Sequence, residues 1–469
     1  MKNILYLPIE TVARDLDPSL FLAHHALRRG FAIVVGEKAE VKRSAQRVGG
    51  GVYIYKHWEA LFPYRFDDER RKNYCYVGYH QEGLVYIDEQ TFLRRMTEKD
   101  RSSMLDLNLV KGEEQRRLLL EFNPTLRPIL HAVGAPTFDI LRPRYAQLFE
   151  RLARSLTKKW GPYVLINTNF YPGNRRRHET DDIIAEREKS SLKNVGRPLT
   201  DEEKEVLRGS IAYKARMYEE YVRALKALAP RFPHLRFIVR PHPSEDHERW
   251  REDLAGTANV HVIFKYNVVN WIVGALAVVH TGCTTALEAW ALGKPVIRFN
   301  PEGRTNSFES PLPNRLGVFA GSIEELVSAI QKAENGELGS SFEAQKEIVR
   351  PYLASVDGLE AADRVLDLIE SVTKHNERVS VEVHAKLRIR ALLWRILVVV
   401  LSHDTLTRYV LGRDRALRYA GLFQKFPGIS RNHVNAFMRA LDAVNGARGD
   451  IVLRRIDANT FLMQNREYE

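Results

Sequence analysis

The chain has 469 residues, of which 44% are hydrophobic and 28% are charged. This length exceeds what one ordinary hydrophobic core accommodates, and the composition excludes an intrinsically disordered chain. The formal net charge of +12 suits nucleic acid, an anionic membrane surface or anionic small molecules as partners. The sequence contains no zinc finger, RNA-binding aromatic strand motif or glycine-arginine tract, so we expect no nucleic-acid partner.

Cysteine usage and the N-terminal segment indicate the compartment. The two cysteines, Cys75 and Cys283, lie far apart in the sequence, and neither belongs to a C-x-x-C pair. This pattern argues against a disulfide framework and a cysteine zinc site, and it fits a reducing compartment. The first residues lack the long apolar core and the cleavage site of a signal peptide. We therefore expect a cytoplasmic protein.

The first part of the chain alternates between strand and helix patterns. A short apolar run at 4–7 predicts a strand, apolar residues at helical spacing follow and end at Gly30, and residues 31–36 predict a second strand. Further strands are predicted at 51–55 and 84–87. Strands that alternate with helices are typical of a doubly wound parallel sheet, which binds ligands beyond the carboxyl ends of its strands. We therefore predict a Rossmann-like domain over residues 1–155 that carries the acceptor.

A second series of the same kind follows. Apolar runs at 163–166, 236–239, 260–263, 277–279 and 295–297 predict strands, and most are separated by helical patterns. They indicate a second Rossmann-like domain over residues 156–345. A highly charged stretch from Arg175 to about Glu205 interrupts it. This stretch is either a solvated loop and helix or a mobile flap over the site.

The C-terminal part of the chain differs in character. Residues 346–375 have a helical pattern and could form a crossing segment that returns to the first domain. Residues 376–469 predict a basic, mainly helical extension with a dense apolar block at 392–401. That block is shorter than the roughly 20 apolar residues that span a bilayer. It predicts either a buried helix or, with Trp394 and nearby basic residues, a helix lying in an anionic membrane surface.

The first motif that could carry chemistry is Arg240-Pro241-His242-Pro243, directly after a predicted strand. A segment with two prolines cannot continue a strand ladder, so the chain must turn out of the sheet there. The turn presents His242 at the ligand-binding edge. An imidazole can donate to a phosphate oxygen and, when protonated, can stabilise a departing phosphate. The alternative is a turn histidine that only ends the strand.

The second motif runs from His280 to Val296 and follows another predicted strand. It contains Thr281, Gly282, Thr284 and Thr285 at the turn, and then a short helical pattern that Gly293 ends. Backbone amides at the start of a helix favour an anion, and threonine hydroxyls add donors without charge. The alternative is a plain helix cap. Two such turns in one domain predict a shared phosphate site.

The segment Glu288-Ala289-Trp290-Ala291-Leu292-Gly293-Lys294-Pro295-Val296 after a Thr-Gly turn resembles the donor half of GT-B glycosyltransferases. The resemblance implies a GT-B-like α/β fold, with two Rossmann-type domains that face a cleft and a mainly helical C-terminal extension. It also implies that Glu288 contacts the ribose of the donor.

More narrowly, the His-Pro pair and the later hydroxyl pair resemble bacterial sialyltransferases, polysialyltransferases and Kdo transferases, which use CMP-activated 2-keto sugar acids. The resemblance implies that His242 and Pro243, with Thr284 and Thr285, hold the CMP phosphate. These families also carry an acidic pair followed by glycine in the first domain. Asp88 and Glu89 follow the predicted strand at 84–87 and match that pair, but Gln90 stands where glycine is expected.

The chemistry open to this acidic pair has two forms. A carboxylate facing the donor can accept the proton of an attacking hydroxyl, which inverts the anomeric centre. It can instead attack the anomeric carbon itself, which gives a covalent intermediate and retention. The sequence leaves open which of Asp88 and Glu89 acts. The alternative is that both are solvated acids at the end of a strand and have no catalytic role.

Over most of its length the chain also resembles bacterial surface carbohydrate biosynthesis proteins. The segments at 7–17, 51–56 and 134–139 carry this likeness. So do Asn167, Asn169 and Asn174 in the loop after the first strand of the second domain, whose amides could bind a nucleotide or sugar.

These observations predict a metal-independent glycosyltransferase of lipopolysaccharide or capsule synthesis. Its donor would be CMP-Kdo or a CMP-nonulosonate, bound without cofactor or metal, because Arg240, His242 and the threonines with their helix N-terminus could neutralise the phosphate. The acceptor, a glycan or lipid-linked glycan, would lie near Glu10 and Lys56, and the basic C-terminal region could bring the enzyme to the membrane. The alternatives are a CDP-polyol phosphotransferase, a UDP-sugar epimerase-like enzyme and a non-catalytic sugar-nucleotide-binding module.

Overall fold

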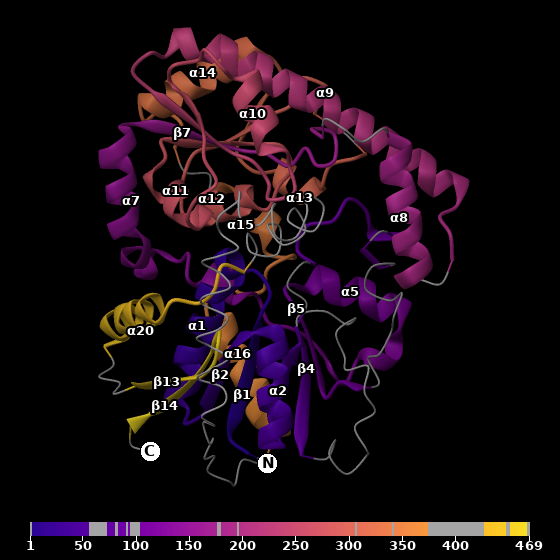
Figure 1. The fold of residues 1–469 in the computed structure, drawn as a ribbon, viewed down its shortest axis with the longest axis vertical. Coiled ribbons are helices and arrows are strands. Elements are labelled where there is room, and N and C mark those ends of the chain that lie inside the picture. The colour runs from indigo at the N-terminus through magenta and orange to yellow at the C-terminus, as the bar shows by residue number, and fades with distance from the viewer. Residues whose placement is uncertain are drawn as a thin grey trace, which may run out of the picture. The chain divides into compact units, whose positions relative to one another are not determined.

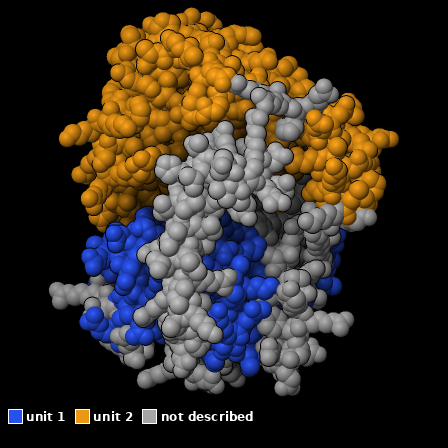
Figure 2. All heavy atoms as spheres, viewed as in Figure 1, with its two compact units in different colours: residues 1–83, 100–140, 351–469 blue, residues 84–99, 141–350 orange. Residues whose placement is uncertain are grey.

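The computed structural model describes residues 2–55, 73–79, 83–90, 92–93, 104–175, 180–194, 197–304, 307–339, 342–373, 426–446 and 451–466. The chain divides into two compact units (Figure 2). Unit 1 consists of residues 1–83, 100–140 and 351–469, and unit 2 of residues 84–99 and 141–350. Each unit has a largely parallel sheet flanked by helices, as the sequence predicted (Figure 1).

The sheet of unit 1 has the strand order β13-β14-β2-β1-β3-β4-β5-β6. The six strands from β2 to β6 in this order are parallel. Their bounds are Ile4–Ile9 (β1), Ala32–Glu37 (β2), Gly51–Tyr55 (β3), Tyr74–Tyr79 (β4), Leu107–Val110 (β5) and Leu130–Ala132 (β6). The expected strands at 4–7, 31–36 and 51–55 are therefore confirmed.

Helices cover both faces of this sheet. Their bounds are Val12–Arg28 (α1), Lys38–Val48 (α2), Glu113–Phe122 (α5), Pro136–Asp139 (α6), Ala361–Val372 (α16) and Arg431–Asn445 (α20). Helix α2 packs on the face that carries a cluster of buried tyrosines, with Tyr6 and Tyr53 stacked at 5.9 Å between ring centroids. Helix α1 packs on β1 and β2 and contacts α16 and α20.

A C-terminal hairpin extends the sheet of unit 1, and the sequence did not predict it. Strands β13 (Ile451–Asp457) and β14 (Thr460–Asn465) pair antiparallel, and β14 pairs antiparallel with β2. A Cβ on Gly36 would lie 2.3 Å from Thr460 Oγ1, so glycine is required for this close approach. The buried Glu40 accepts hydrogen bonds from Asn459 N (2.8 Å) and Thr460 Oγ1 (2.9 Å), which fixes the hairpin against α2. The apolar block at 392–401 and its flanking basic residues lie outside the described residues.

One predicted strand of the first domain is wrong. Residues 84–87 form no strand, and they belong to unit 2. The run Leu-Val-Tyr-Ile has the composition of a strand. A strand forms only where neighbouring strands pair with it, and residues 84–87 pair with no described strand. The parallel ladder instead continues through β4, β5 and β6, which the sequence analysis missed.

The sheet of unit 2 is parallel throughout, with the order β12-β11-β10-β7-β8-β9. The strands span Tyr163–Asn167 (β7), Arg236–Arg240 (β8), Val260–Val262 (β9), Ala277–His280 (β10), Val296–Phe299 (β11) and Val318–Ala320 (β12). All five predicted strands are confirmed, and β12 was missed. From β7 the chain adds β8 and β9 on one side of the sheet, and it then adds β10, β11 and β12 on the other side. The direction in which strands are added therefore reverses between β7 and β10.

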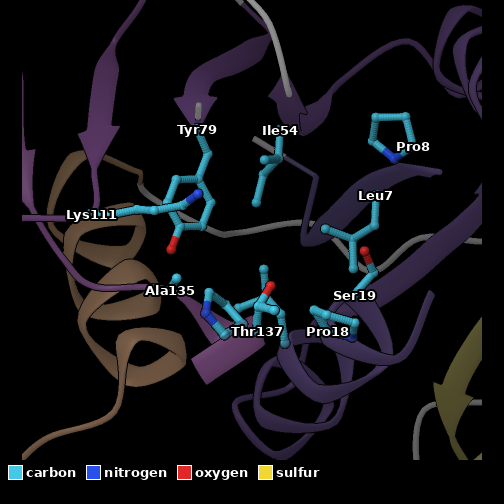
Figure 3. A pocket seen from close by; sticks show the side chains of 11 residues that line it. Leu7, Pro8, Pro18, Ser19, Ile54, Tyr79, Lys111, Ala135 and Thr137 are labelled. Carbon is cyan, nitrogen blue, oxygen red and sulfur yellow. The ribbon is translucent and has the colours of Figure 1, made fainter. Parts of the chain in front are cut away.

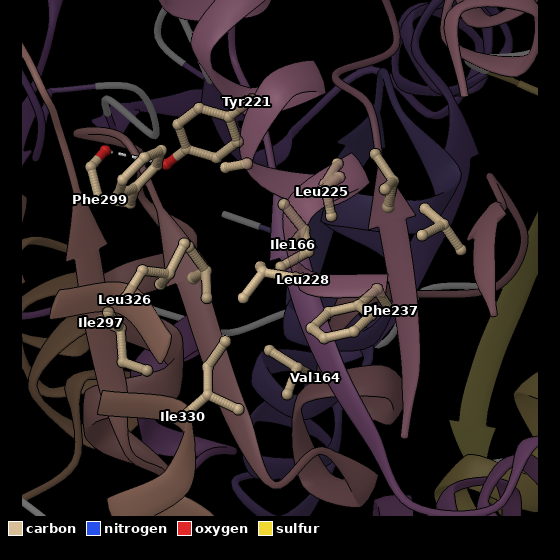
Figure 4. Close-up of a cluster of buried hydrophobic side chains, with 14 of the residues drawn as sticks. Val164, Ile166, Tyr221, Leu225, Leu228, Phe237, Ile297, Phe299, Leu326 and Ile330 are labelled. Carbon is tan, nitrogen blue, oxygen red and sulfur yellow. Dashed lines mark hydrogen bonds between the residues drawn. The ribbon is translucent and has the colours of Figure 1, made fainter. Parts of the chain in front are cut away.

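The main core of unit 2 lies on one face of this sheet. Helices α9 (Asp201–Arg231) and α14 (Ile323–Glu334) supply Tyr221, Leu228 and Ile330, which pack against strand residues such as Ile166 and Phe237 (Figure 4). The Tyr221 hydroxyl donates to Phe299 O at 3.1 Å. Helix α11 (Val268–Gly274) contacts α7 (Gln147–Trp160), α12 (Thr285–Ala291) and β7, and α12 contacts β10 and β11.

The charged stretch after β7 is largely helical in its described part. Helix α8 spans Thr180–Asn194, and the long helix α9 follows. Thr200 and Glu203 form a reciprocal capping box at the start of α9, because each side chain bonds the other residue's backbone amide. Within the described residues, no helix is long and apolar enough to cross a bilayer.

Candidate functional site

Four polar side chains form one row across the carboxyl edge of the sheet in unit 2. The register pairs Arg298 with His280, His280 with Asn167, and Asn167 with Arg240. Each is the last or nearly the last residue of its strand, and all four are buried. Their strand neighbours Ile166, Val239 and Val279 belong to the core cluster under α9, and side chains alternate along a strand. The row therefore faces the opposite side, where α12 follows β10.

This position is where an open parallel sheet binds its ligand. The row crosses β7 and β10, between which the strand order switches, and ligands bind outside the carboxyl ends of strands at such a point. Three of its buried polar atoms, Asn167 Nδ2, His280 Nε2 and Arg298 Nε, have no hydrogen-bond partner among the described residues. Buried polar groups in proteins are normally satisfied, so these three atoms are candidates to bind a ligand.

His280 begins the turn between β10 and α12. Its Nδ1 accepts from Gly282 N at 3.1 Å, which leaves the neutral ring with its proton on Nε2. Burial, with Arg298 nearby, lowers the pKa of His280 to about 3, so the ring is neutral at physiological pH. Gly282 has a φ of 61°, a left-handed conformation that favours glycine.

Arg240 and Glu288 place opposite charges at the other end of the row. The Arg240 guanidinium donates to the carbonyls of Lys265 (2.7 Å) and Tyr266 (3.1 Å), so its position is fixed by backbone. Burial lowers the pKa of Arg240 to about 10. Burial raises the pKa of Glu288 to about 7, although Arg240 opposes that shift. Glu288 Oε2 has no hydrogen-bond partner among the described residues, so it can accept a bond from a ligand hydroxyl.

The raised pKa of Glu288 predicts a pH-dependent stability difference. The pKa of Glu288 is about 7 in the folded chain and has the ordinary value of 4.5 in the unfolded chain. As pH rises, the carboxyl group therefore loses its proton at a lower pH in the unfolded chain than in the folded chain. The free energy of unfolding therefore falls as pH rises from 4.5 to 7. Glu288→Gln has no carboxyl group to ionise at this position, so it does not lose this free energy. The free energy of unfolding of the variant minus that of the natural chain should therefore be greater at pH 8 than at pH 5. Denaturant unfolding at both pH values measures this.

The matched control for this prediction is Glu252→Gln, because Glu252 is an exposed carboxylate at the end of α10 (His247–Asp253) in the same unit. Its stability relative to the natural chain should be the same at both pH values. An equal effect of Glu288→Gln at the two pH values would contradict the assigned pKa.

His242 lies exposed in the turn after β8. Its Nδ1 accepts from Ser244 N at 3.2 Å, so the neutral ring carries its proton on Nε2, the nitrogen that can donate to a ligand. The backbone of the turn is fixed as well, since His242 N donates to Glu245 Oε1 at 3.0 Å and His242 O bonds His247 Nε2 at 3.1 Å.

Glu245 connects this turn with the loop after β7. It is buried, and its two oxygens accept from Thr168 Oγ1 (3.0 Å), Phe170 N (3.1 Å), His242 N (3.0 Å) and Trp250 Nε1 (2.8 Å). Burial raises its pKa, and these four donors oppose that shift. The carboxylate therefore holds the turn that carries His242 in a fixed place relative to β7.

At the opposite end of the row, Arg298 belongs to a buried polar network. It donates to Glu309 Oε2 at 2.8 Å and to Arg304 O at 2.6 Å. Glu309 also accepts from Tyr213 of α9 at 2.5 Å and from Asn314 at 2.7 Å. This network anchors the guanidinium beside His280.

The threonines of the second motif lie around the start of α12, where Thr281 is in the preceding turn, Thr284 is the N-cap and Thr285 is the first helical residue. Thr281 is buried, Thr284 is exposed at the N-cap without a side-chain capping bond, and Thr285 Oγ1 lies 2.6 Å from Cys283 Sγ. Pro243 is exposed beside His242. The two turns thus follow β8 and β10, the two strands that flank β7 in the sheet.

Two asparagines of the loop after β7 differ in surroundings. Asn169 is partly exposed. Asn174 is fully buried, and its side chain donates to Asp246 O (3.2 Å) and accepts from Asp246 N (3.1 Å). The structure therefore gives Asn174 a bracing role at the start of α10, instead of leaving its amide for a ligand.

The residues that the sequence predicted for the acceptor side are divided between the two units or lie outside the described part of the chain. Asp88 and Glu89 are exposed and lie in unit 2, so their expected place at a strand end of the first domain is wrong. Glu10 follows β1 in unit 1, where its carboxylate accepts from Lys38 Nζ at 2.5 Å. Lys56 lies outside the described residues.

Sequence reasoning missed Arg298, Glu245 and the role of His280. A signal existed for Arg298, because a charged residue inside the apolar run Val-Ile-Arg-Phe is unusual in a strand buried on both faces. Glu245 was missed because two of its donors, Thr168 and Phe170, lie 77 and 75 residues away in the sequence, although His242 and Trp250 are near neighbours.

A group of side chains of types that can bind a metal lies in unit 1. Among the described residues, His25, Glu360 and Asp363 place ligand atoms within 4.8 Å of one another. Arg29 already donates to Asp363 Oδ1 at 3.0 Å, and this positive charge opposes a cation there.

No family model and no curated protein sequence matches this chain. Similar solved structures include the UDP-GlcNAc 2-epimerase of Methanocaldococcus jannaschii with UDP-GlcNAc and UDP, at 12% identity and a TM-score of 0.44, covering 79% of this chain and 100% of that one. The wall teichoic acid polymerase TagF has 10% identity and a TM-score of 0.47, with 79% and 89% covered. Anabaena HepE in complex with UDP and glucose has 11% identity and a TM-score of 0.44, with 79% and 100% covered. Likeness at this level assigns no activity to this chain.

Proposed function

We propose that this chain is a glycosyltransferase that binds a nucleotide-activated sugar in unit 2 and builds a bacterial surface glycan. The observation that carries the proposal is the buried polar row of Arg298, His280, Asn167 and Arg240 at the point where the strand order switches. The two turns that carry His242 and Thr284 follow β8 and β10, the strands on either side of β7.

The groups at this edge suit the parts of a nucleotide sugar. The Arg240 guanidinium and the His242 Nε2–H offer positive charge and a donor to a phosphate. Glu288 offers an acceptor for ribose hydroxyls, as the GT-B resemblance implies. These protein groups can neutralise the phosphate without a metal ion, which is the form of the reaction that we propose.

The donor that we favour is a CMP-linked 2-keto sugar acid, such as CMP-Kdo or a CMP-nonulosonate. The His242-Pro243 pair and the Thr284-Thr285 pair support this choice through the motif resemblance. The net charge of +12 favours a donor with a sugar carboxylate and a phosphate. The acceptor would be a glycan or lipid-linked glycan, and the basic segment after residue 375 would hold the enzyme at the membrane that contains it.

In the transfer step, an acceptor hydroxyl oxygen bonds to the anomeric carbon, and the bond from that carbon to the phosphate oxygen breaks. The electron pair leaves with CMP, where His242 donates a hydrogen bond to the departing phosphate. In the inverting form, Asp88 or Glu89 receives the hydroxyl proton. In the retaining form, the carboxylate of one of them bonds to the anomeric carbon as the bond to the CMP phosphate breaks. The acceptor hydroxyl oxygen then displaces that carboxylate, and the other acid receives the hydroxyl proton. The anomeric configuration of the product distinguishes the two forms.

Nucleotide binding tests the donor class. Calorimetric titration with CMP, CDP and UDP should give the tightest binding for CMP, because its single phosphate matches one anion site. Arg240→Gln should weaken CMP binding by at least about tenfold, because it removes a charge-assisted interaction with the phosphate. Arg236→Gln, a strand-start arginine that is partly exposed on the same strand, is the matched control. Absence of binding by any cytidine nucleotide would contradict the CMP form.

The acidic pair is tested separately. Glu89→Gln or Asp88→Asn should lower transfer by about 10²–10⁴-fold, the usual contribution of a catalytic acid or base, while CMP affinity stays unchanged. Product formation from labelled donor measures this. Because both residues are exposed, neither change should alter the unfolding midpoint. Unchanged turnover in both variants would remove the pair from the mechanism.

The alternative functions give different products. A polyol phosphotransferase would consume CDP-glycerol and release CMP, and an epimerase would convert a UDP-sugar in the absence of any acceptor. A non-catalytic binding module would bind nucleotide without turnover. One assay with the three donors and product analysis by mass spectrometry separates these outcomes.

A further inference from the structure

Helix α9 brings a lysine to the carboxyl edge of the sheet in unit 2. Lys214 lies near the middle of α9 and is half-buried. Its ammonium donates to Tyr171 O at 2.9 Å, in the loop that follows β7. Strand β7 lies between β8 and β10, and the turns after those two strands carry His242 and Thr284. Lys214 therefore contacts the loop of the strand that separates the two turns.

Two contacts hold the part of α9 that carries Lys214. A Cβ on Gly173 would lie 2.4 Å from Ala215 N and 2.6 Å from Lys214 C, so the loop after β7 approaches the backbone of α9 directly. The neighbouring Tyr213 hydroxyl donates to Oε1 of the buried Glu309 at 2.5 Å. The backbone of Lys214 is therefore fixed before a ligand binds, which reduces the entropy lost on binding.

Two buried carboxylates that act on Lys214 each contact one of the two turns. Glu245 accepts from His242 N at 3.0 Å, in the turn after β8. Glu309 lies against the turn after β10, because a Cβ on Gly282 would lie 3.4 Å from Glu309 Cβ. Both carboxylates interact electrostatically with the Lys214 ammonium. The ammonium therefore lies within electrostatic range of the side chains that brace both turns.

The Lys214 ammonium forms no ion pair with a described carboxylate. Glu245 already accepts hydrogen bonds from four groups and Glu309 from three, so both carboxylates are occupied. Burial lowers the pKa of Lys214, and Arg187 of α8 adds to that shift, while the two carboxylates oppose it. Charged groups removed from water are normally paired, and this ammonium has two N–H donors beyond the one on Tyr171 O. An anionic group of a ligand would supply the missing partner.

We propose that Lys214 is a phosphate-binding residue, whose ammonium bonds a phosphate oxygen of the ligand that the turns of His242 and Thr284 hold. This inference rests on the proposed nucleotide site and adds to it a cation from α9. Arg240 and the two turns approach the phosphate from the strand ends, whereas Lys214 approaches it from a helix on the core face of the sheet. Lysine suits this role, because its ammonium is a compact charge with three rotatable donors.

Calorimetric titration of the full chain with two pairs of probes tests this role: CMP with cytidine, and UDP with uridine. The members of each pair differ only in phosphate. For the nucleotide that binds the natural chain more tightly, Lys214→Met should weaken binding by at least about tenfold, because it removes a hydrogen bond between charged groups. Binding of the matching nucleoside, followed by NMR where it is weak, should not change. Lys214→Arg should bind the nucleotide more tightly than Lys214→Met does, because arginine keeps the positive charge.

The matched control is Lys226→Met, because Lys226 is an exposed lysine on the same helix. It should bind both nucleotides as the natural chain does. Unchanged nucleotide affinity in Lys214→Met would overturn the role of Lys214 and leave the proposed function standing. An equal loss for nucleotide and nucleoside would also overturn that role, because it would show a change in the fold and not a lost phosphate contact. A natural chain that binds neither nucleotide would overturn both proposals.

Discussion

Replacing His242 by alanine is expected to lower the rate of sugar transfer by about 10²–10³-fold, the usual cost of removing one donor from a developing negative charge. The side chain is exposed and its Nδ1 accepts one backbone hydrogen bond, from Ser244 N, so the fold should persist. We expect the free energy of unfolding to change by less than about 0.5 kcal/mol, as at other surface positions. Transfer from CMP-sugar and denaturant unfolding measure the two effects.

Two further variants make the His242 prediction specific. His242→Gln keeps an N–H donor without an ionisable ring, so it should recover part of the lost rate if the Nε2–H acts as a hydrogen-bond donor. His234→Ala, an exposed histidine of the same unit that pairs with Glu334, is the matched control and should keep full activity. A His242→Ala enzyme with natural turnover would contradict the assigned role.

Replacing Glu245 by alanine is expected to have the largest effect on stability. The change leaves Trp250 Nε1, Thr168 Oγ1 and two backbone amides without their acceptor in a buried place. Each unsatisfied buried donor costs about 1–3 kcal/mol, so the free energy of unfolding should fall by at least about 3 kcal/mol. Chemical denaturation followed by tryptophan fluorescence measures the loss.

The Glu245 prediction also has a functional part. Because the carboxylate fixes the His242 turn against the loop after β7, Glu245→Gln should weaken nucleotide binding even where the variant folds. Glu248→Ala removes an exposed glutamate of α10 and is the matched control, with natural stability and binding. If Glu245→Ala unfolded at the same denaturant concentration as the natural chain, these hydrogen bonds would contribute little to the free energy of unfolding.

The sequence predicted unit 2 more fully than unit 1. Its strands β7 to β11 are short apolar runs bounded by turn residues, and such patterns are local, so they can be recognised without the fold. In unit 1, β4 has the sequence Tyr-Cys-Tyr-Val-Gly-Tyr and was missed, while the strand-like run at 84–87 joins no ladder. Propensity alone did not separate the two, because a strand is stabilised by its neighbours in the sheet.

The two turns of the candidate site were also predictable. The prolines beside His242 restrict the backbone through their rings, and Gly282, which lacks a Cβ, permits the left-handed conformation of its turn. The sequence therefore determined that turns follow β8 and β10 and that they carry His242 and the threonines. It also determined the charge balance that favours an anionic ligand.

The tertiary structure alone decided which side chains share the site. Arg298, His280, Asn167 and Arg240 lie on four strands, and only the register of the parallel ladder places them in one row. The same holds for the hairpin β13-β14 beside β2 and for the small pocket of unit 1 between β1, β3, β4 and α6 (Figure 3), which join segments far apart in the chain. Local periodicity specifies an element, whereas strand order and register arise from packing over the whole sheet, so no local pattern contained them.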